Sequence, residues 1–523
     1  MEEERCCACA SGVARVFRIG GRSLFFRRAR TVHELVGDSM GVDLDQCHTL
    51  DLGELLLHKD STRSFTKHYK MIAQLGKGGF GAVYKAESLL MGEVRAVKVM
   101  AKTRIAKEIA SIATEIEVLI RLRHPNIISF YEFFEETQAI CLVTELCEGG
   151  DFSKISKFPS QQIRTLYRDV FNGVAYLHEN GVAHRDLKFE NCLLVEAPHR
   201  KVGKVIDFGL AAIRREFDDE EWLDDKLGTS YFIAPEVILK RTYGTKCDLW
   251  ALGVMVFITL TGEHPFAEKA SSLPANKLFD AILRKPLREA LFDKKHVDAD
   301  ARLLIGGLLE RIPEQRLDCH SSLEHRWLRP SSLAAELSPS SMCATRSQEV
   351  AEADARILCT SETSRFQKLL LLLSAHHAKA SDVDDMRVAF MAQDANGDGV
   401  LSLEEVMSGM RQCGVTLSDE EIEAKFRDLD TDNNGSFGYI EWLSATLDES
   451  AIVSEGHMKE MFEFFDRDGS GLITRSELLS FLEGEEVDDL LQEGDTGKDG
   501  NIDFEEFKAM CLALARSRHS FAK

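Results

Sequence analysis

The alternation of apolar and polar residues predicts strands early in the chain and helices after them. Between residues 69 and 98, short apolar runs are separated by glycines, which predicts strands joined by tight turns. Residues 140–145 are mostly apolar and predict a buried strand. Helical periodicity covers 109–122 and 163–178, and the apolar stretch 253–260 predicts a buried helix. No apolar run approaches the roughly 18 residues that a membrane-spanning helix needs.

A change of pattern marks the middle of the chain. Residues 330–348 are rich in Ser, Ala and Pro, which is typical of a linker. Arg365 then opens a predicted helix that runs through Leu373 toward His376.

The composition limits the classes of function. The chain has 523 residues, too many for one core, and about two to four domains are expected. Its net charge of −22 argues against a general nucleic-acid-binding protein and fits a region that binds cations. The 13 cysteines lack the spacing of a zinc site or a disulfide framework, which favours a reducing, cytoplasmic location.

The first 65 residues have a different character. Seven arginines and no acid lie between residues 5 and 30, close to Cys6, Cys7 and Cys9. Glu2 excludes N-myristoylation, which requires glycine at that position. The cysteines could be S-acylated and hold the chain at an anionic membrane surface. The alternative is a disordered, solvated extension.

Residues 184–191 place an acid, a lysine and an amide on one loop. This arrangement suits phosphoryl transfer, in which the protein orients a hydroxyl and holds metal-bound phosphates. Asp186 is predicted to accept the hydroxyl proton, Lys188 to lie against the transferred phosphate and Asn191 to ligate Mg²⁺. Alone, this segment is equally consistent with a polar surface loop.

A glycine-rich turn supplies the complementary phosphate site. Glycines at 76, 78 and 81 allow the backbone to close over phosphates without interference from Cβ atoms. Lys98 follows on the next predicted strand as a cation for the α- and β-phosphates. Glu115 is the expected partner of Lys98, with Glu117 as the competing candidate on the same helix.

These segments, with Asp207-Phe208-Gly209 and Ala234-Pro235-Glu236, resemble the signature set of eukaryotic protein kinases over residues 69–328. The resemblance implies that Asp207 joins Asn191 as a Mg²⁺ ligand and that Asp186, Lys188, Asn191 and Asp207 form the catalytic set. It also implies a partnership of Glu236 with Arg316. The implied ATP-binding residues are Leu75, Gly76, Gly78, Gly81, Val83, Ala96, Lys98, Glu115, Thr144, Glu145, Cys147 and Asp151.

The activation segment lacks an acceptor for regulatory phosphate. From Leu210 to Leu227 there is no Ser, Thr or Tyr, whereas several acids lie between 218 and 225. Kinases switched by phosphorylation of this loop need a hydroxyl there. Arg185 is therefore expected to pair with a carboxylate, and activation is expected to come from elsewhere in the chain.

The C-terminal part contains an internal repeat of four 12-residue acidic loops. Alternating oxygen ligands, a glycine at position 6 and a glutamate at position 12 are what Ca²⁺ requires, and position 7 ligates through its backbone. Apolar residues at position 8 predict that the loops pair through short ladders. Gly497 replaces the usual position-3 oxygen, so loop 4 is expected to be the weakest. The predicted Ca²⁺ ligands are Asp394, Asn396, Asp398, Val400 and Glu405 (loop 1), Asp430, Asp432, Asn434, Ser436 and Glu441 (loop 2), Asp466, Asp468, Ser470, Leu472 and Glu477 (loop 3), and Asp495, Asp499, Asn501 and Glu506 (loop 4).

A kinase joined to four EF-hands resembles the calcium-dependent protein kinase family of plants and protists. The resemblance implies a fold of class α+β, a two-lobed protein kinase, followed by an all-α calmodulin-like domain of two EF-hand pairs. It implies an enzyme that transfers the ATP γ-phosphate to Ser or Thr of protein substrates, using Mg²⁺, and that Ca²⁺ releases from inhibition. The expected domains are an extension (1–65), the kinase (69–328), a linker and regulatory junction (329–385) and EF-hand pairs at 386–446 and 455–515.

Two other functions are consistent with the same residues. A calcium-binding adaptor with an inactive kinase fold would normally lack one of the catalytic positions, and none is missing here. A constitutive kinase whose EF-hands only buffer Ca²⁺ has the same sequence features. A kinase assay with and without Ca²⁺ distinguishes the three.

Overall fold

The computed structural model describes most of the chain. Gly78, Asp432, the acids of the activation segment and most of the N-terminal extension and linker lie outside the described residues. The described residues are 15–19, 22–26, 36, 40, 64–77, 81–105, 109–197, 200–213, 230–240, 243–329, 364–378, 380–394, 396–412, 418–430, 434–447, 453–482 and 484–521.

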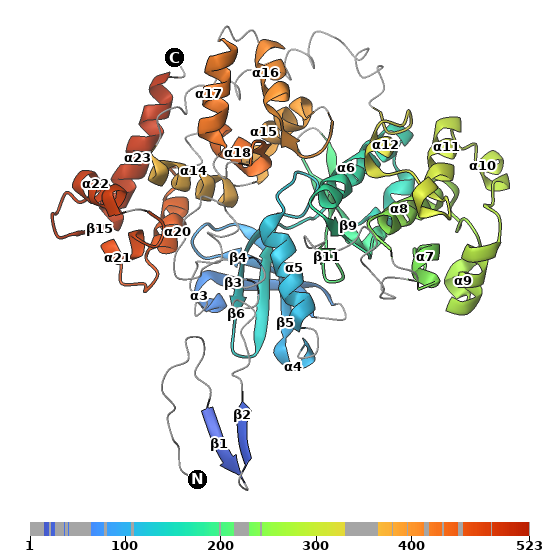
Figure 1. Cartoon of the computed structure of the whole chain (residues 1–523), viewed down its shortest axis with the longest axis horizontal. Helices are drawn as coiled ribbons and strands as arrows, with labels where there is room; N and C mark the ends of the chain where they lie inside the picture. The colour runs from blue at the N-terminus through green and yellow to red at the C-terminus, as the bar shows by residue number, and fades with distance from the viewer. Residues whose placement is uncertain are drawn as a thin grey trace.

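The N-terminal lobe is a five-stranded antiparallel sheet with the order β3-β4-β5-β7-β6, preceded by α3 (Phe65–His68). The predicted strand-turn-strand at residues 69–98 is the β3-β4-β5 meander. Helix α5 lies beside the sheet, after the short helix α4 (Figure 1). The elements are β3 (Tyr69–Lys77), β4 (Ala82–Ser88), β5 (Val94–Ala101), α4 (Lys102–Ile105), α5 (Ile109–Arg121), β6 (Phe130–Glu135) and β7 (Ala139–Thr144).

The C-terminal lobe is mainly helical. Helix α8 is apolar around most of its surface and is buried along nearly its whole length, as its sequence predicts. It ends at Gly262, whose φ of 78° is a left-handed conformation that glycine adopts without strain. The elements are η1 (Phe152–Lys157), α6 (Ser160–Glu179), β8 (Val182–Ala183), η2 (Phe189–Asn191), β9 (Cys192–Glu196), β10 (Lys201–Val205), β11 (Ala212–Ile213), α7 (Pro235–Ile238), α8 (Lys246–Thr261), η3 (Ala270–Ser272), α9 (Ala275–Arg284), α10 (Ala290–Lys294), α11 (Ala299–Leu308), η4 (Pro313–Gln315) and α12 (Cys319–Leu323).

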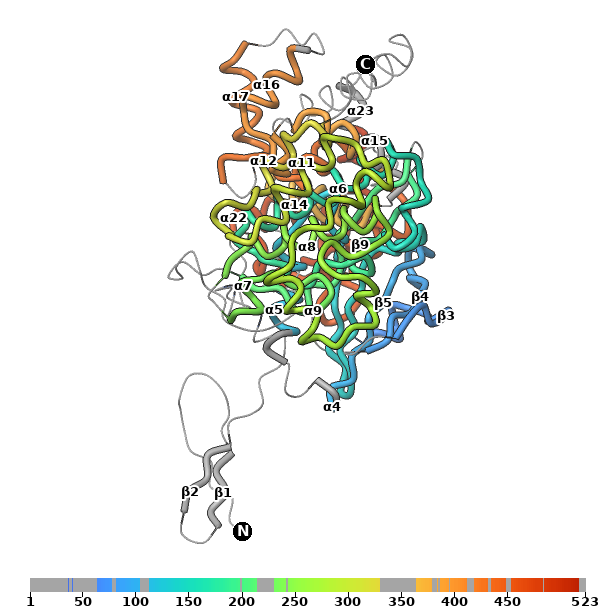
Figure 2. Tube along the Cα trace, turned by 90° about the vertical axis from the view of Figure 1, so that its right-hand side faces the viewer, coloured from blue at the N-terminus to red at the C-terminus, as the bar shows by residue number. Residues whose placement is uncertain are grey.

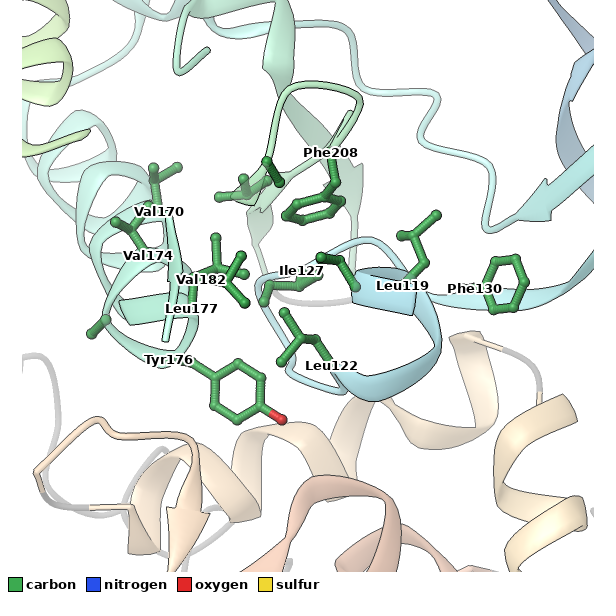
Figure 3. Packing of buried hydrophobic residues seen from close by; sticks show 14 of the residues in the cluster. Leu119, Leu122, Ile127, Phe130, Val170, Val174, Tyr176, Leu177, Val182 and Phe208 are labelled. Atoms are coloured by element: carbon green, nitrogen blue, oxygen red, sulfur yellow. The ribbon is translucent and has the colours of Figure 1, made fainter. Parts of the chain in front are cut away.

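One hydrophobic core connects the two lobes behind the catalytic segments. Leu119 of α5, Val170 of α6 and Phe208 all belong to it and are buried. Figure 3 shows Tyr176 at the edge of this core, beside the faint orange ribbon of the EF-hand region. The core therefore links α5, which carries Glu115, to the segment that carries Asp207.

The regulatory part begins with α14 (Arg365–His377), at the position predicted for a helix. Ser364 and Gln367 form a capping box at its N-terminus. Helix α14 packs against α18 and α20, one helix from each EF-hand pair. The remaining elements are α15 (Ala380–Gln393), β12 (Val400–Leu401), α16 (Leu403–Gln412), α17 (Asp419–Leu429), β13 (Phe437–Gly438), α18 (Tyr439–Thr446), α20 (Glu455–Phe465), β14 (Leu472–Thr474), α21 (Arg475–Leu478), α22 (Gly484–Gly494), β15 (Asn501–Asp503) and α23 (Phe504–Phe521).

The loops pair as their apolar position-8 residues predict. Leu401 lies opposite Phe437 in the β12–β13 ladder, and Ile473 lies opposite Ile502 in the β14–β15 ladder. Both views of the molecule place α16 and α17 at the end opposite α4 (Figures 1 and 2).

Two short strands are described within the N-terminal extension, where the sequence leaves a disordered segment as one alternative. β1 (Arg15–Ile19) pairs antiparallel with β2 (Arg22–Phe26). Across the described part of the chain, none of the helices combines the length and the apolarity that crossing a bilayer requires.

Candidate active site and metal-binding loops

Lys98 joins the two lobes at the centre of the site. Its Nζ lies 2.5 Å from Glu115 Oε1 and 3.0 Å from Asp207 Oδ1. Strand β5 presents the lysine and helix α5 presents the glutamate, whose side chain is only 5 % exposed. Glu117 instead pairs with Arg121, one turn along the same helix, at 3.0 Å. The prediction that Glu115 and not Glu117 is the partner of Lys98 is confirmed.

Neighbouring charges shift the pKa values of Lys98 and Asp207 toward their charged forms. Burial acts to lower the pKa of Lys98, but the carboxylates of Glu115 and Asp207 outweigh it and raise the pKa above its ordinary value. Burial acts to raise the pKa of Asp207, and the neighbouring Lys98 ammonium outweighs it, so the pKa of Asp207 is lowered. Lys98 is therefore a cation and Asp207 an anion at neutral pH.

The catalytic loop is held in place by a buried aspartate. Asp248 of α8 accepts hydrogen bonds of 2.9 Å from the backbone N–H groups of His184 and Arg185. It also lies 2.9 Å from His178 Nε2. Arg185 has a φ of 65°, an uncommon conformation for a residue with a side chain, and these bonds hold it there.

Asp186, Lys188 and Asn191 converge, as the sequence predicts. Lys188 Nζ donates a short hydrogen bond to Asp186 Oδ2. Asn191 Nδ2 donates to the Asp186 carbonyl at 2.8 Å and to Asp186 Oδ2 at 3.2 Å. Asp186 thus faces two polar partners that fix the direction of its carboxylate.

Most of the predicted nucleotide-binding residues that the structure describes lie on or beside strands β3, β4, β5 and β7. A Cβ on Gly81 would lie 2.1 Å from the Val99 carbonyl oxygen, so only glycine allows β4 to approach β5 there. Ala96 is buried on β5, whereas Leu75 is exposed at the end of β3. Gly76, Val83 and Thr144 lie on β3, β4 and β7.

Three of the predicted nucleotide-binding residues lie in the segment after β7. Glu145 forms an ion pair with Lys204 at 2.6 Å and accepts a hydrogen bond from Ser129 N, while its own backbone N–H donates to the Ser129 carbonyl at 2.9 Å. Burial raises the pKa of the Cys147 thiol, so this cysteine stays protonated and unreactive. Asp151 caps η1 by accepting a 2.9 Å hydrogen bond from the N–H of Ser153.

The expected carboxylate partner of Arg185 is not seen among the described residues. Arg185 Nε donates instead to the backbone carbonyl of Leu210 at 2.6 Å, and a second bond of 3.4 Å reaches the carbonyl of Ala211. These carbonyls come directly after Asp207-Phe208-Gly209, within reach of the guanidinium, whereas the acids at 218–225 lie outside the described residues.

The end of the activation segment is fixed by a buried ion pair. Arg316 Nη1 and Nη2 lie 2.7 and 2.9 Å from the two carboxylate oxygens of Glu236. The side chains are 0 % and 5 % exposed. This bidentate arrangement confirms the predicted partnership of Glu236 with Arg316.

The four acidic loops share the same turn at their position-6 glycine. In each loop the position-1 aspartate accepts a hydrogen bond from the N–H of the position-6 glycine, at 2.7 to 3.0 Å. All four glycines have φ values between 80° and 84°, which explains the invariant residue type at this position. The aspartates are Asp394, Asp430, Asp466 and Asp495, and the glycines are Gly399, Gly435, Gly471 and Gly500.

The position-12 glutamates fold back over their loops. In loop 3, Glu477 Oε1 accepts from Arg467 N at 2.7 Å and Oε2 from Thr474 N at 2.8 Å. Carboxylate oxygens of Asp466, Asp468 and Glu477 lie within 4.8 Å of one another, the one such group found among the described residues. These hard oxygen donors around a tight glycine turn fit Ca²⁺.

Loop 4 differs from loop 3 at position 3, as predicted. Gly497 offers no side-chain oxygen, and its N–H donates to Glu506 Oε1 at 2.8 Å. The corresponding place in loop 3 holds Asp468. Loop 4 therefore lacks the position-3 carboxylate that loop 3 offers to a cation.

Contacts between the regulatory part and the kinase lobes have no signal in the sequence. His376 of α14 donates from Nε2 to the backbone carbonyl of Tyr131 at 2.8 Å. Glu460 of α20 lies 3.7 Å from Arg95 Nη1, and Arg95 is 1 % exposed. The guanidinium of Arg95 also lies 3.9 Å from the centre of the Tyr131 ring. The His376–Tyr131 and Glu460–Arg95 pairs join segments that are hundreds of residues apart, which no local pattern reveals.

Comparison with known proteins assigns the family. A protein kinase domain model matches residues 69–328, and an EF-hand domain pair model matches 383–446 and 455–512. Calcium-dependent protein kinase 2 of Zea mays is 31% identical over 84% of this chain and 85% of its own length. This chain belongs to the calcium-dependent protein kinases. Calcium-dependent protein kinases 5 and 4 of Plasmodium falciparum are 33% and 30% identical, over 84% and 92% of this chain and 77% and 94% of their own lengths.

The predicted fold class, family and activity are thereby confirmed. This calcium-dependent protein kinase transfers phosphate from ATP to Ser or Thr of protein substrates, uses Mg²⁺ and is regulated by Ca²⁺ through its EF-hands. Glu460 of the EF-hand region contacts Arg95 of the kinase domain within the same chain. The adaptor with an inactive kinase fold is the weaker hypothesis, because the relatives are kinases and the catalytic groups are in place.

Proposed function

We propose that Asp186 is the general base that accepts the proton of the substrate Ser or Thr hydroxyl. Lys188, hydrogen-bonded to Asp186 Oδ2, neutralises charge on the transferred phosphate. Lys98, oriented by Glu115, binds the α- and β-phosphates of ATP. This is largely positioning and electrostatic work, as phosphoryl transfer requires.

Asn191 and Asp207 are the residues that would hold Mg²⁺. Bound there, the ion neutralises charge that develops on the phosphates. The side chain of Asp207 is 41 % exposed, so a metal ion can reach it, and its carboxylate is an anion at neutral pH, so it can bind a cation. The observation that carries the assignment is Lys98 Nζ, which bridges Glu115 and Asp207 and so brings the two lobes to one centre.

The test is Asp186→Asn in the full chain. Loss of a general base lowers the rate by about 10²- to 10⁴-fold. Nucleotide binding should persist, because Asp186 acts on the hydroxyl and not on ATP. A variant with near-normal turnover would refute the role of Asp186.

We also propose that the kinase prefers a basic residue N-terminal to the target hydroxyl. Glu190 is exposed beside the catalytic loop, and Asp151 lies at the start of η1. A basic peptide side chain would gain a charge-assisted pair with these acids. A peptide array on the wild type and on Glu190→Gln tests this. The proposal fails if the wild type shows no preference for upstream Arg or Lys.

The proposed domains are the kinase at 69–328, a junction at 329–385 and EF-hand pairs at 386–446 and 455–515. Ca²⁺ binding by the four loops would control the kinase through the junction, and α14 supports this role because it contacts both EF-hand pairs and the sheet.

A further proposal concerns the N-terminal extension. Its arginines and its cysteines at 6, 7 and 9 suit a cytoplasmic chain held at an anionic membrane surface, with a solvated tail as the alternative. Sedimentation with phosphatidylserine vesicles, with and without prior S-acylation, distinguishes the two.

A further inference from the structure

The first EF-hand loop differs from the other three in its surroundings. A Cβ on Gly399 would lie 2.5 Å from His124 Cδ2 and 2.7 Å from Tyr176 Cδ2. At the equivalent Gly435, Gly471 and Gly500, a Cβ would meet nothing within 4 Å. Gly399 is buried and the other three glycines are exposed. Loop 1 is therefore seated on the kinase domain, and its seat is the ring pair His124–Tyr176.

A second contact extends the seat along α6. Gly397 is also buried, and a Cβ there would lie 3.3 Å from Asn172 Oδ1 and 3.6 Å from Leu323 Cδ1. Asn172 is 6 % exposed, and its Oδ1 has no hydrogen-bond partner in the part of the chain that the structure describes. A buried amide oxygen is thus directed at the backbone of a Ca²⁺ loop.

His124 lies in the segment that follows α5. This segment is hydrogen-bonded to β10, the strand that leads to Asp207. His124 and Tyr176 stack with ring centroids 5.1 Å apart, and His124 Nδ1 accepts a hydrogen bond from Asn126 N. The Asn126 side chain donates to the Gly203 carbonyl of β10 at 3.1 Å, and Ile127 bridges to Val205. Strand β10 leads directly to Asp207. Loop 1 therefore contacts the segment between Glu115 and Asp207.

Glu179, at the end of α6, lies near loop 1. Burial, and after it the carboxylates of Asp398 and Asp394, raise the pKa of Glu179 above its ordinary value. Without a cation these like charges oppose docking. A cation in the loop removes that repulsion, so it favours the docked arrangement. By thermodynamic reciprocity, docking raises the Ca²⁺ affinity of loop 1 by the same factor.

We propose that loop 1 is the calcium-dependent contact between the EF-hand region and the kinase domain. The Gly399 turn docks on His124 and Tyr176, and Glu179 of the kinase domain adds to the negative field of the loop. The inference rests on the proposed Ca²⁺ sites and deepens them, because it names the loop whose occupancy the kinase domain senses.

Hydrogen exchange on the full chain, with and without Ca²⁺, tests the contact. Ca²⁺ should protect the peptide 122–128 in the wild type. Gly399→Ala should remove this protection, whereas Gly471→Ala should retain it. Both substitutions place Ala at a φ near 84°, so the backbone strain is matched and only the first adds an atom against the kinase. Equal effects of the two substitutions, or no protection in the wild type, would overturn the proposal.

A second variant leaves the loop itself intact. Glu179→Gln should weaken Ca²⁺ binding at one site by about two- to fivefold, the range of an exposed charge pair. Glu289→Gln, an exposed acid at the start of α10, should leave all sites unchanged. Calorimetric Ca²⁺ titration of the full chain measures both. If Glu179→Gln binds Ca²⁺ with wild-type affinity at every site, the proposed electrostatic coupling between Glu179 and loop 1 is refuted.

These measurements separate the inference from the proposed function, since neither involves phosphate transfer. A chain that binds Ca²⁺ but leaves 122–128 unprotected refutes the contact alone. A chain that binds no Ca²⁺ refutes the proposed ligand sets as well.

Discussion

His376 Nε2 donates a 2.8 Å hydrogen bond to the backbone carbonyl of Tyr131, so the regulatory helix α14 touches the edge strand of the kinase sheet. The two rings also contact each other, with centroids 6.0 Å apart. At the same time Lys98 and Glu115 are paired. The docked regulatory region is therefore compatible with an assembled active site.

Removal of residues 329–523 should give a kinase whose activity does not respond to Ca²⁺. The activation segment has no Ser, Thr or Tyr from 210 to 227, so the regulatory region is the visible switch. Kinase assays with Ca²⁺ and with a chelator measure the ratio of the two activities, which should be near one for the truncated kinase. The full chain is the control, and a truncated kinase that Ca²⁺ still stimulates would place the sensor elsewhere.

Glu115→Gln should lower kcat/KM by about 10- to 100-fold, because Lys98 loses the carboxylate that orients it toward the phosphates. Glu117→Gln is the matched control, two residues away on the same helix and paired with Arg121. It should retain nearly full activity. Similar losses in both variants would indicate a general defect of α5 and not a role for the Lys98 pair.

Arg316→Met should destabilise the kinase domain by about 3–5 kcal/mol, the usual cost of leaving one partner of a buried ion pair uncompensated. Arg302→Met breaks an exposed pair with Asp293 and should cost about 1 kcal/mol or less. Thermal unfolding in the presence of excess chelator compares the two. Equal shifts in Tm would mean that the buried Glu236–Arg316 pair stabilises the protein no more than the exposed Arg302–Asp293 pair does.

Glu477→Gln should reduce Ca²⁺ activation more than Glu506→Gln. Loop 3 has Asp466, Asp468 and Glu477 in one cluster, whereas loop 4 has Gly497 at the third position. Loops 3 and 4 pair through the Ile473–Ile502 ladder. Pairing should therefore reduce the difference in Ca²⁺ affinity between the two loops. Ca²⁺ titrations of activity and of heat on the full chain would decide the order. A fourth loop tighter than the third would contradict the prediction.

Features whose parts lie close together in the chain were predictable. The predicted Ca²⁺ ligands of each loop lie within 12 residues, and the positive φ of Gly471 follows from its place in that pattern. The same holds for Asp186 and Asn191, five positions apart on one loop. The choice of Glu115 as partner of Lys98 needed the family resemblance as well, because Glu117 is as acidic and lies on the same helix.

The sequence does not specify side-chain partners that come from distant parts of the fold. Arg185 was expected to meet a carboxylate because no phosphate acceptor lies in the activation segment. Its described partners are the carbonyls of Leu210 and Ala211. A guanidinium has several donors and takes whichever acceptors the fold brings near, and residue types alone do not specify those.

The sequence by itself determined the kinase family, the four loops and their pairing, since each is encoded by residue types at short, fixed spacings. Only the tertiary structure decided that α14 reaches Tyr131, 245 positions away, and that Gly399 alone among four equivalent glycines is buried against the kinase domain. The physical reason is that burial is a property of two packed surfaces. A loop carries the same ligands whether it faces solvent or His124, and packing between distant elements settles which of these occurs.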